Sequence, residues 1–227
     1  MVRVFVVLCE REVEGLKTMK TAIIFDCEFL CIEGSQRRFW CGADDPDPVV
    51  AQIGAVKLSL QDGFDILQTT KIYVKPKDRF GEAIKISPFL AQLTKITQAQ
   101  IDSEGVGLAK ALIQLDEFSS GSAFWSWGKD ELNLLGIGCF VEGIAPPIPA
   151  HRFANAVNLF VAAQMPMEDI VRTPSNKLAE YFEISHPTLC AHDGLDDALS
   201  VAYSLQFLLL EGRLKTLEFQ RSTMPNS

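Results

Sequence analysis

A short apolar segment that ends in two acidic residues constrains the fold of this chain most. Residues 22–25 (Ala-Ile-Ile-Phe) form the continuous apolar run of a buried strand, and residues 26–29 (Asp-Cys-Glu-Phe) continue it with alternating polarity. Because residues two apart on a strand point to the same face, Asp26 and Glu28 would stand side by side. Like charges at that separation repel, so the pair indicates a divalent cation, which prefers oxygen ligands. The alternative is that both carboxylates are solvated at the strand end.

The remaining hydrophobic pattern predicts an α/β domain with one mixed sheet. Strands are expected at residues 22–29, 49–60, 66–74, 123–127 and 150–157, and helices at residues 87–95, 103–119, 130–141, 176–182 and 196–210. The domain is expected to cover residues 19–213. Residues 1–18 are interpreted as an extension or a misplaced start, and residues 214–227 as a tail that becomes disordered from residue 220.

Composition limits the classes of function. A chain of 227 residues with 48% hydrophobic content suits one domain with a sizeable core. The net charge of −8 argues against broad, non-specific binding to a nucleic-acid backbone, although an enzyme that gathers its acids around cations is compatible with it. Six cysteines without a Cys-x-x-Cys pair indicate reduced thiols in a cytoplasmic protein. The longest apolar stretch, residues 198–210, is too short for a bilayer, and no signal peptide is expected.

Two later segments place acidic residues at the start of expected helices. Asp130 follows an expected strand and opens a helix, where the alternative is a helix-capping role. His192 precedes Asp197 by five residues, with Gly194 between them. Asp197 would then lie in the first turn of an apolar helix, with His192 on the preceding loop and free to approach the same centre. The alternatives are helix capping by Asp197 and a surface histidine.

Five motifs stand in one order along the chain: residues 25–28 (Phe-Asp-Cys-Glu), 52–56 (Gln-Ile-Gly-Ala-Val), 93–97 (Leu-Thr-Lys-Ile-Thr), 127–130 (Trp-Gly-Lys-Asp) and 192–197 (His-Asp-Gly-Leu-Asp-Asp). Together they resemble the DEDD-type exonucleases of the DnaQ-like group, in the subclass that uses histidine. Residues 27–34 look similar to the exoribonucleases that trim histone messenger RNA and small interfering RNA, which also carry a long insertion before the second strand.

This resemblance implies a ribonuclease H-like three-layer fold, with a mixed five-stranded sheet flanked by helices. It also implies a 3′-to-5′ exonuclease that releases nucleoside 5′-monophosphates from single-stranded RNA or DNA. Asp26, Glu28, Asp130 and Asp197 would hold two Mg²⁺ or Mn²⁺ ions, and His192 would take a proton from a metal-bound water. No membrane partner is expected, and a homodimer is possible because family members often dimerise.

Single-strand binding needs cations and stacking surfaces, and the long insertion supplies candidates for both. The candidates are Phe29, Arg37, Arg38 and Trp40, with a second basic stretch at Lys75, Lys77, Arg79 and Lys85. For the charged residues the alternative is a solvated loop. Phe29 departs from the family pattern, in which a small residue is common, and its bulk could narrow the pocket or stack on a base.

Several interpretations stay open. RNA is favoured slightly as substrate, and a DNA proofreading or repair exonuclease of the same fold is the first alternative. A catalytically silent nucleic-acid-binding module is the second, disfavoured because all four acids and the histidine are present. The third is a metal hydrolase with a different substrate, which the acidic net charge supports slightly and the ordered motifs oppose.

Overall fold

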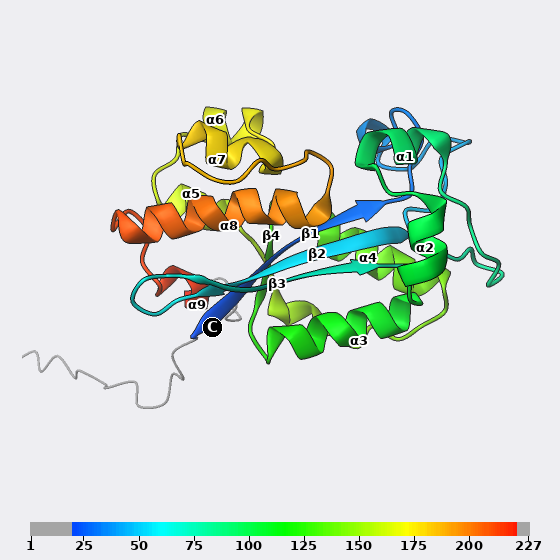
Figure 1. Cartoon of the computed structure of the whole chain (residues 1–227), viewed down its shortest axis with the longest axis horizontal. Helices are drawn as coiled ribbons and strands as arrows, with labels where there is room; N and C mark the ends of the chain where they lie inside the picture. The colour runs from blue at the N-terminus through cyan, green and yellow to red at the C-terminus, as the bar shows by residue number, and fades with distance from the viewer. Residues whose placement is uncertain (1–19, 222–227) are drawn as a thin grey trace, which may run out of the picture.

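The computed structural model describes residues 20–221 and contains one mixed sheet with helices on both faces (Figure 1). The strands are β1 (Thr21–Phe29), β2 (Val50–Ser59), β3 (Ile66–Tyr73), β4 (Phe124–Ser126) and β5 (Phe153–Asn155), in the order β3-β2-β1-β4-β5. β1 pairs antiparallel with β2, which pairs antiparallel with β3. On its other side β1 pairs parallel with β4, which pairs parallel with β5. The α/β class and the mixed five-stranded sheet expected from the sequence are confirmed.

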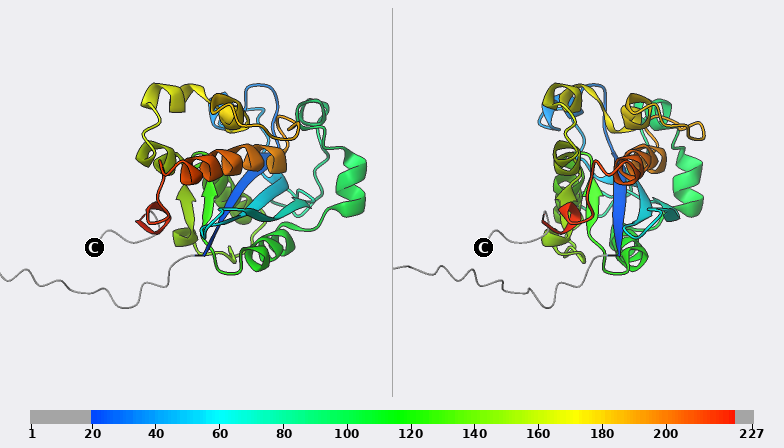
Figure 2. Two further views of the ribbon diagram at one scale, coloured as in Figure 1. Left: turned by 60° about the vertical axis from the view of Figure 1, so that its left-hand side comes forward. Right: turned by 90° about the vertical axis from the view of Figure 1, so that its left-hand side faces the viewer.

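Helices cover both faces of this sheet and make three layers. They are α1 (Pro88–Thr94), α2 (Gln98–Glu104), α3 (Leu108–Ser119), α4 (Asp130–Val141), α5 (Val157–Ala162), α6 (Met167–Arg172), α7 (Leu178–Tyr181), α8 (Gly194–Leu210) and α9 (Glu218–Arg221). α8 packs on one face, and α3 and α4 pack on the other (Figure 2). Within residues 20–221, no helix is long and apolar enough to cross a membrane.

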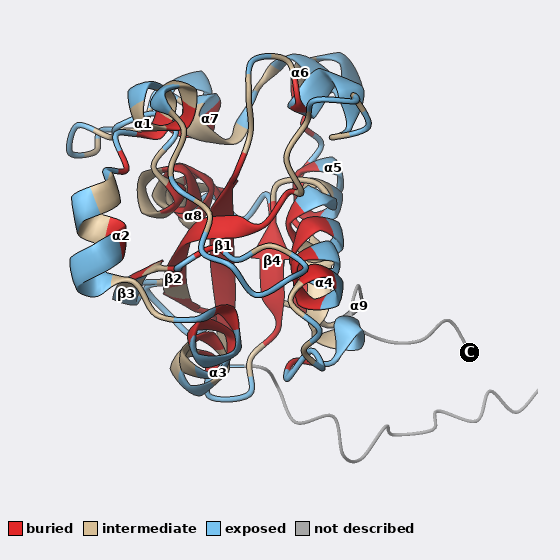
Figure 3. Cartoon of the chain, turned by 90° about the vertical axis from the view of Figure 1, so that its right-hand side faces the viewer, coloured by how far each residue is buried: buried red, intermediate tan, exposed pale blue. Residues whose placement is uncertain are grey.

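The alternation of residues in β1 separates the two hydrophobic cores. Ile24 belongs to the core beneath α8, whereas Phe25 and Cys27 belong to the core formed with α3 and α4. Figure 3 shows how thoroughly β1 is buried between the layers. Asp26 and Glu28 continue the α8 side of β1 at its C-terminal end, so the strand carries both carboxylates out of the core on one face.

Two elements differ from the expectation because of local turn chemistry. The helix expected at residues 103–119 begins later, at Leu108, and a separate helix that was not expected, α2, covers Gln98–Glu104. Thr97 begins α2 with a capping box, in which Thr97 and Gln100 each bond the other's backbone amide. The strand expected at residues 150–157 is reduced to β5, which lies between a 3₁₀ turn at Ala150–Arg152 and α5.

The packed core continues beyond residue 213. Leu214 and Phe219 are buried, and the Phe219 ring centroid lies 5.2 Å from that of Trp125. The segment that ends in α9 therefore contributes to the core beneath α8. The disorder predicted from residue 220 is wrong for residues 220–221, which form the end of α9. The predictions for residues 1–18 and for residues 222–227 lie outside the described residues.

Gly54 of β2 lets the first turn of α8 approach the sheet closely. A Cβ atom added to Gly54 would lie 2.0 Å from the backbone nitrogen of Leu195, and one added to Gly194 would lie 3.0 Å from the carbonyl oxygen of Asp26. The Gly194 amide also donates a 2.7 Å hydrogen bond to Oε1 of Gln52, whose side chain is buried. These contacts fix the start of α8 against the end of β1.

We expect Gly54→Ala to lower the free energy of unfolding by about 1–3 kcal/mol, because the added methyl group must displace the backbone of α8. Chemical denaturation measures the change. Gly136→Ala is the matched control: Gly136 is exposed on α4 and a Cβ there meets nothing within 4 Å. The control should gain about 0.5–1 kcal/mol from helix propensity. A Gly54→Ala protein as stable as the wild type would contradict the close approach.

Candidate active site

Asp26 and Glu28 face a cavity of about 390 Å³ at the C-terminal end of β1. The walls come from β1, the loop that follows it, α1, the start of α4, the segment before α7 and the start of α8. The carboxylates and the histidine that line it are Asp26, Glu28, Asp130, Glu131, His192 and Asp197. Segments far apart in the sequence thus bring ionisable side chains to one cavity.

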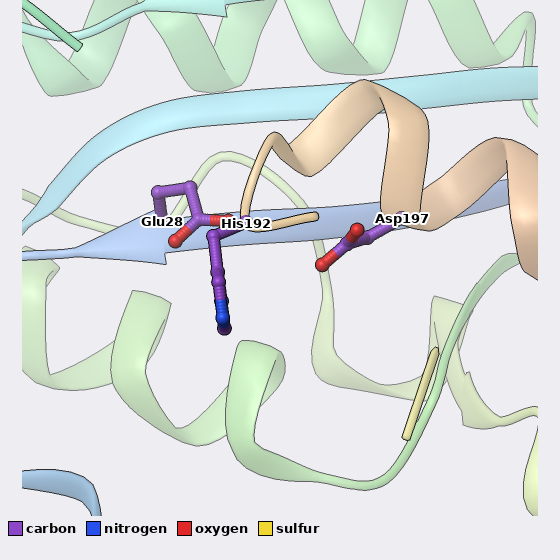
Figure 4. Close-up of side chains that lie close together, drawn as sticks. All are labelled: Glu28, His192 and Asp197. Atoms are coloured by element: carbon purple, nitrogen blue, oxygen red, sulfur yellow. The ribbon is translucent and has the colours of Figure 1, made fainter. Parts of the chain in front are cut away.

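Three of these side chains converge most closely. Glu28, His192 and Asp197 each offer one ligand atom, and these atoms lie within 4.8 Å of one another. Figure 4 shows the Asp197 carboxylate extending from the first turn of α8 toward Glu28 and His192. Glu28 and Asp197 are buried, whereas His192 is exposed. The cluster therefore combines two desolvated carboxylates with an imidazole that water and a ligand can reach.

The loop that carries His192 is fastened on both sides. Asp193 caps α8 by accepting hydrogen bonds from two backbone amides of its first turn, and its other oxygen lies 2.6 Å from Nζ of Lys71 on β3. The Cys190 amide donates a 2.7 Å hydrogen bond to Asp196, which closes the loop around His192. His192 itself has a φ of 61°, in the left-handed region. The backbone is thus held in an uncommon conformation at the residue expected to be the base.

Burial raises the pKa values of the carboxyl groups in the cavity. The pKa of Asp26 lies well above its ordinary value, first because of burial and then because of repulsion from Glu131 and Glu28. Burial, reinforced by the nearby Asp197, raises the pKa of Glu28 to about 8. Burial raises the pKa of Asp197 to about 7, against the opposing effect of a hydrogen bond from the His192 backbone. Near neutral pH the cluster therefore retains protons that a cation would displace.

The donor atoms fit a hard divalent cation. Among the described residues, Oδ1 of Asp197 and Oε2 of Glu131 are buried without a hydrogen-bond partner. A cation would satisfy such oxygens, because buried polar atoms are costly when unpaired. Carboxylate oxygens suit Mg²⁺ and Mn²⁺, which are the ions that the resemblance implies.

The two acidic residues at the start of α4 occupy different environments. Asp130, the residue expected from the sequence, is exposed at the cavity edge. Glu131 is 8% exposed, and burial raises its pKa to about 7. Sequence reasoning did not select Glu131. The available signal was its place three and four residues before Leu134 and Leu135, which are buried on the same face of α4.

The expected substrate-binding residues divide into two groups. Phe29, Arg37 and Trp40 line the cavity, with Arg37 exposed and Trp40 held by a 2.7 Å hydrogen bond from its Nε1 to a backbone carbonyl. Arg38 lies outside the cavity lining, because its guanidinium lies 2.6 Å from the carboxylate of Asp45. Arg38 thus serves to shape the loop.

The second basic stretch, at residues 75–85, lies outside the lining of this cavity. Arg79 pairs with Asp47 at 2.8 Å, which joins this stretch to the loop after β1. Since both side chains are partly exposed, the pair contributes little to stability.

Without a divalent cation, the protein should lose stability as the pH rises. The folded-state pKa values of Glu28 and Asp197, about 8 and about 7, exceed the ordinary carboxyl values near 4. The unfolded chain therefore releases its protons at lower pH than the folded chain does. The stabilising effect is fully present below about pH 4 and is lost as the pH rises through about 7–8. We expect the Tm in EDTA to fall across this window.

The same Tm measurement is repeated with Mg²⁺ and with Glu28→Gln, a variant that lacks the charge of Glu28. Mg²⁺ should raise the Tm most at about pH 8, where the repulsion is greatest. Glu28→Gln should raise the Tm in EDTA at that pH by about 2–8 °C, equivalent to roughly 1–2 kcal/mol. A Tm in EDTA that stays constant over the window, in both proteins, would contradict the raised pKa values.

Comparisons with known proteins support the fold. No protein-family model matches the sequence, and no curated protein matches it. A full-length 3′-exonuclease has a TM-score of 0.67 and 20% identity, with 86% of this chain covered. A second similar structure shows 3′-end specific recognition of the histone mRNA stem-loop by a 3′-exonuclease. It has a TM-score of 0.66 and 20% identity to this chain, with 85% of this chain and 83% of that chain covered.

Cell-death related nuclease 4 has a TM-score of 0.65 and 20% identity, with 87% of this chain and 67% of that chain covered. The chain spans 62% of the length of the full-length 3′-exonuclease. The sheet order and flanking helices match these structures, so the chain has the ribonuclease H-like fold that these nucleases share.

Proposed function

We propose that this protein is a metal-dependent 3′-to-5′ exonuclease that hydrolyses single-stranded nucleic acid and releases nucleoside 5′-monophosphates. The convergence of Glu28, His192 and Asp197 beside Asp26 in one cavity carries the proposal. The shared fold of 3′-exonucleases supports it. RNA is the favoured substrate, since one of the similar structures recognises the 3′ end of histone mRNA.

Each residue has a distinct part in this reaction. Asp26, Glu28 and Asp197, with a carboxylate from the start of α4, would hold two Mg²⁺ or Mn²⁺ ions. The ions would stabilise the attacking and leaving oxygens of an in-line displacement. His192, exposed beside these carboxylates, would accept the proton of the attacking water. An imidazole suits this step near neutral pH because its ordinary pKa is about 6.5.

The cavity suits one nucleotide at the end of a single strand. Its volume of about 390 Å³ lies within the usual range for small-ligand sites. Phe89 and Leu93 of α1 and Trp127 provide apolar surface on which a base could pack. Arg37, on the loop after β1, offers a cation for the phosphate backbone.

The direct test compares oligonucleotides labelled at the 3′ or the 5′ end. We expect loss of the 3′ label and a descending ladder from the 5′-labelled strand, with Mg²⁺ or Mn²⁺ and not with EDTA. Glu28→Gln should reduce kcat by at least about 100-fold, because it removes a metal ligand without changing shape. Parallel RNA and DNA strands identify the preferred sugar. Intact oligonucleotides with either metal and folded protein would favour the silent binding module.

Two neighbouring arginines offer a matched pair of variants. Arg37→Ala should raise KM for an oligonucleotide by about 3–10-fold with little change in Tm, because Arg37 is exposed on the cavity wall. Arg38→Ala should instead make the loop more susceptible to limited proteolysis, because it removes the partner of Asp45. Equal effects of both variants on KM, with no difference in proteolysis, would contradict this division.

A further inference from the structure

We propose that Glu131, the second residue of α4, supplies the fourth carboxylate of the metal centre, and that Asp130 stays outside it. This assignment rests on the proposed function, since it names a ligand for the same cations. It differs from the sequence-based expectation, which placed Asp130 in that role. The two residues are adjacent, so only their orientation on α4 distinguishes them.

The orientation of Glu131 favours it as a ligand. Its side chain is 8% exposed, and Oε2 has no hydrogen-bond partner among the described residues. The Ser126 side chain, at the end of β4, is near enough to the Glu131 carboxyl group to oppose the rise in its pKa that burial causes. A buried carboxylate with one unpaired oxygen is costly unless a cation or a donor satisfies it. The cavity that Glu131 lines also holds Asp26 and Glu28, which supply the other oxygens of such a site.

Asp130 has no comparable need for a cation. It is exposed, and it is the first residue of α4, where its charge interacts favourably with the helix dipole and with water. Successive residues on a helix point about 100° apart. Glu131 shares a face of α4 with the buried Leu134 and Leu135, which follow it by three and four residues, whereas Asp130 is exposed at the edge of the cavity that both residues line.

The longer side chain of glutamate compensates for its position one residue further along the helix. A glutamate carboxylate extends beyond an aspartate carboxylate by one methylene group, or roughly 1.5 Å. Glu131 therefore reaches the cavity from a backbone position one residue further along α4. Glu131→Asp provides a graded test of this reach.

The assignment can be tested without measuring nuclease activity. Mn²⁺ is titrated into the full chain at about pH 8, without nucleic acid, and binding is measured by isothermal titration calorimetry. We expect Glu131→Gln to lose one Mn²⁺ site or to weaken Mn²⁺ binding by at least about 10-fold. Glu131→Asp should fall between Glu131→Gln and the wild type. Asp130→Asn should bind within about twofold of the wild type. Weaker binding by Asp130→Asn, with Glu131→Gln unchanged, would overturn the proposal.

Melting temperatures show whether weaker Mn²⁺ binding by Glu131→Gln comes from a folding defect. The isosteric Glu131→Gln should melt at the same or a higher temperature than the wild type in EDTA, and its Mn²⁺-dependent rise in Tm should be smaller. Wild-type protein that binds Mn²⁺ through Glu131 but degrades no oligonucleotide would reject the proposed function and leave this assignment standing. If the wild type is an active nuclease and Glu131→Gln retains both Mn²⁺ sites, the proposed function stands and the assignment of Glu131 as a ligand is rejected. Wild-type protein that binds no Mn²⁺ would overturn both.

Discussion

Repulsion among the carboxylates gathered at the end of β1 is the constraint on which the rest of the site depends. Asp26, Glu28, Glu131 and Asp197 are all buried, and burial of like charges opposes folding. The fold tolerates this arrangement because β1 is the central strand and α8 is seated on the sheet at Gly54. A rigid set of oxygens that cannot relax apart is suited to a cation, because little reorganisation is needed on binding.

The parts of the site that depend on geometry within one element could be predicted from sequence. Asp26 and Glu28 share a face because a strand repeats every two residues. His192 and Asp197 meet because the helix begins between them, which places one residue on the loop and the other in the first turn. The mixed sheet followed from the same reasoning, since β1, β2 and β3 have clear patterns and β4 is short but strongly apolar.

The parts that depend on tertiary packing could not be predicted in this way. Burial of Glu131 and exposure of Asp130 depend on the rotation of α4 about its axis, which contacts with β1 and β2 determine. Arg37 and Arg38 look equivalent in sequence, and only the fold of their loop gives Arg38 an acidic partner. β5 is shorter than its apolar sequence indicates, because it forms three residue pairs with β4 and then turns into α5.

The loop after β1 has a consequence for the thermodynamics of binding. Asp45 has no exposed side-chain surface, pairs with Arg38 and accepts a 2.8 Å hydrogen bond from Ser35. Phe39 and Trp40 both adopt left-handed backbone conformations within it. The conformational entropy of this wall is therefore lost during folding and not during association. A ligand that enters the cavity meets a preformed surface, so more of the interaction free energy remains available for affinity and for orienting the ligand.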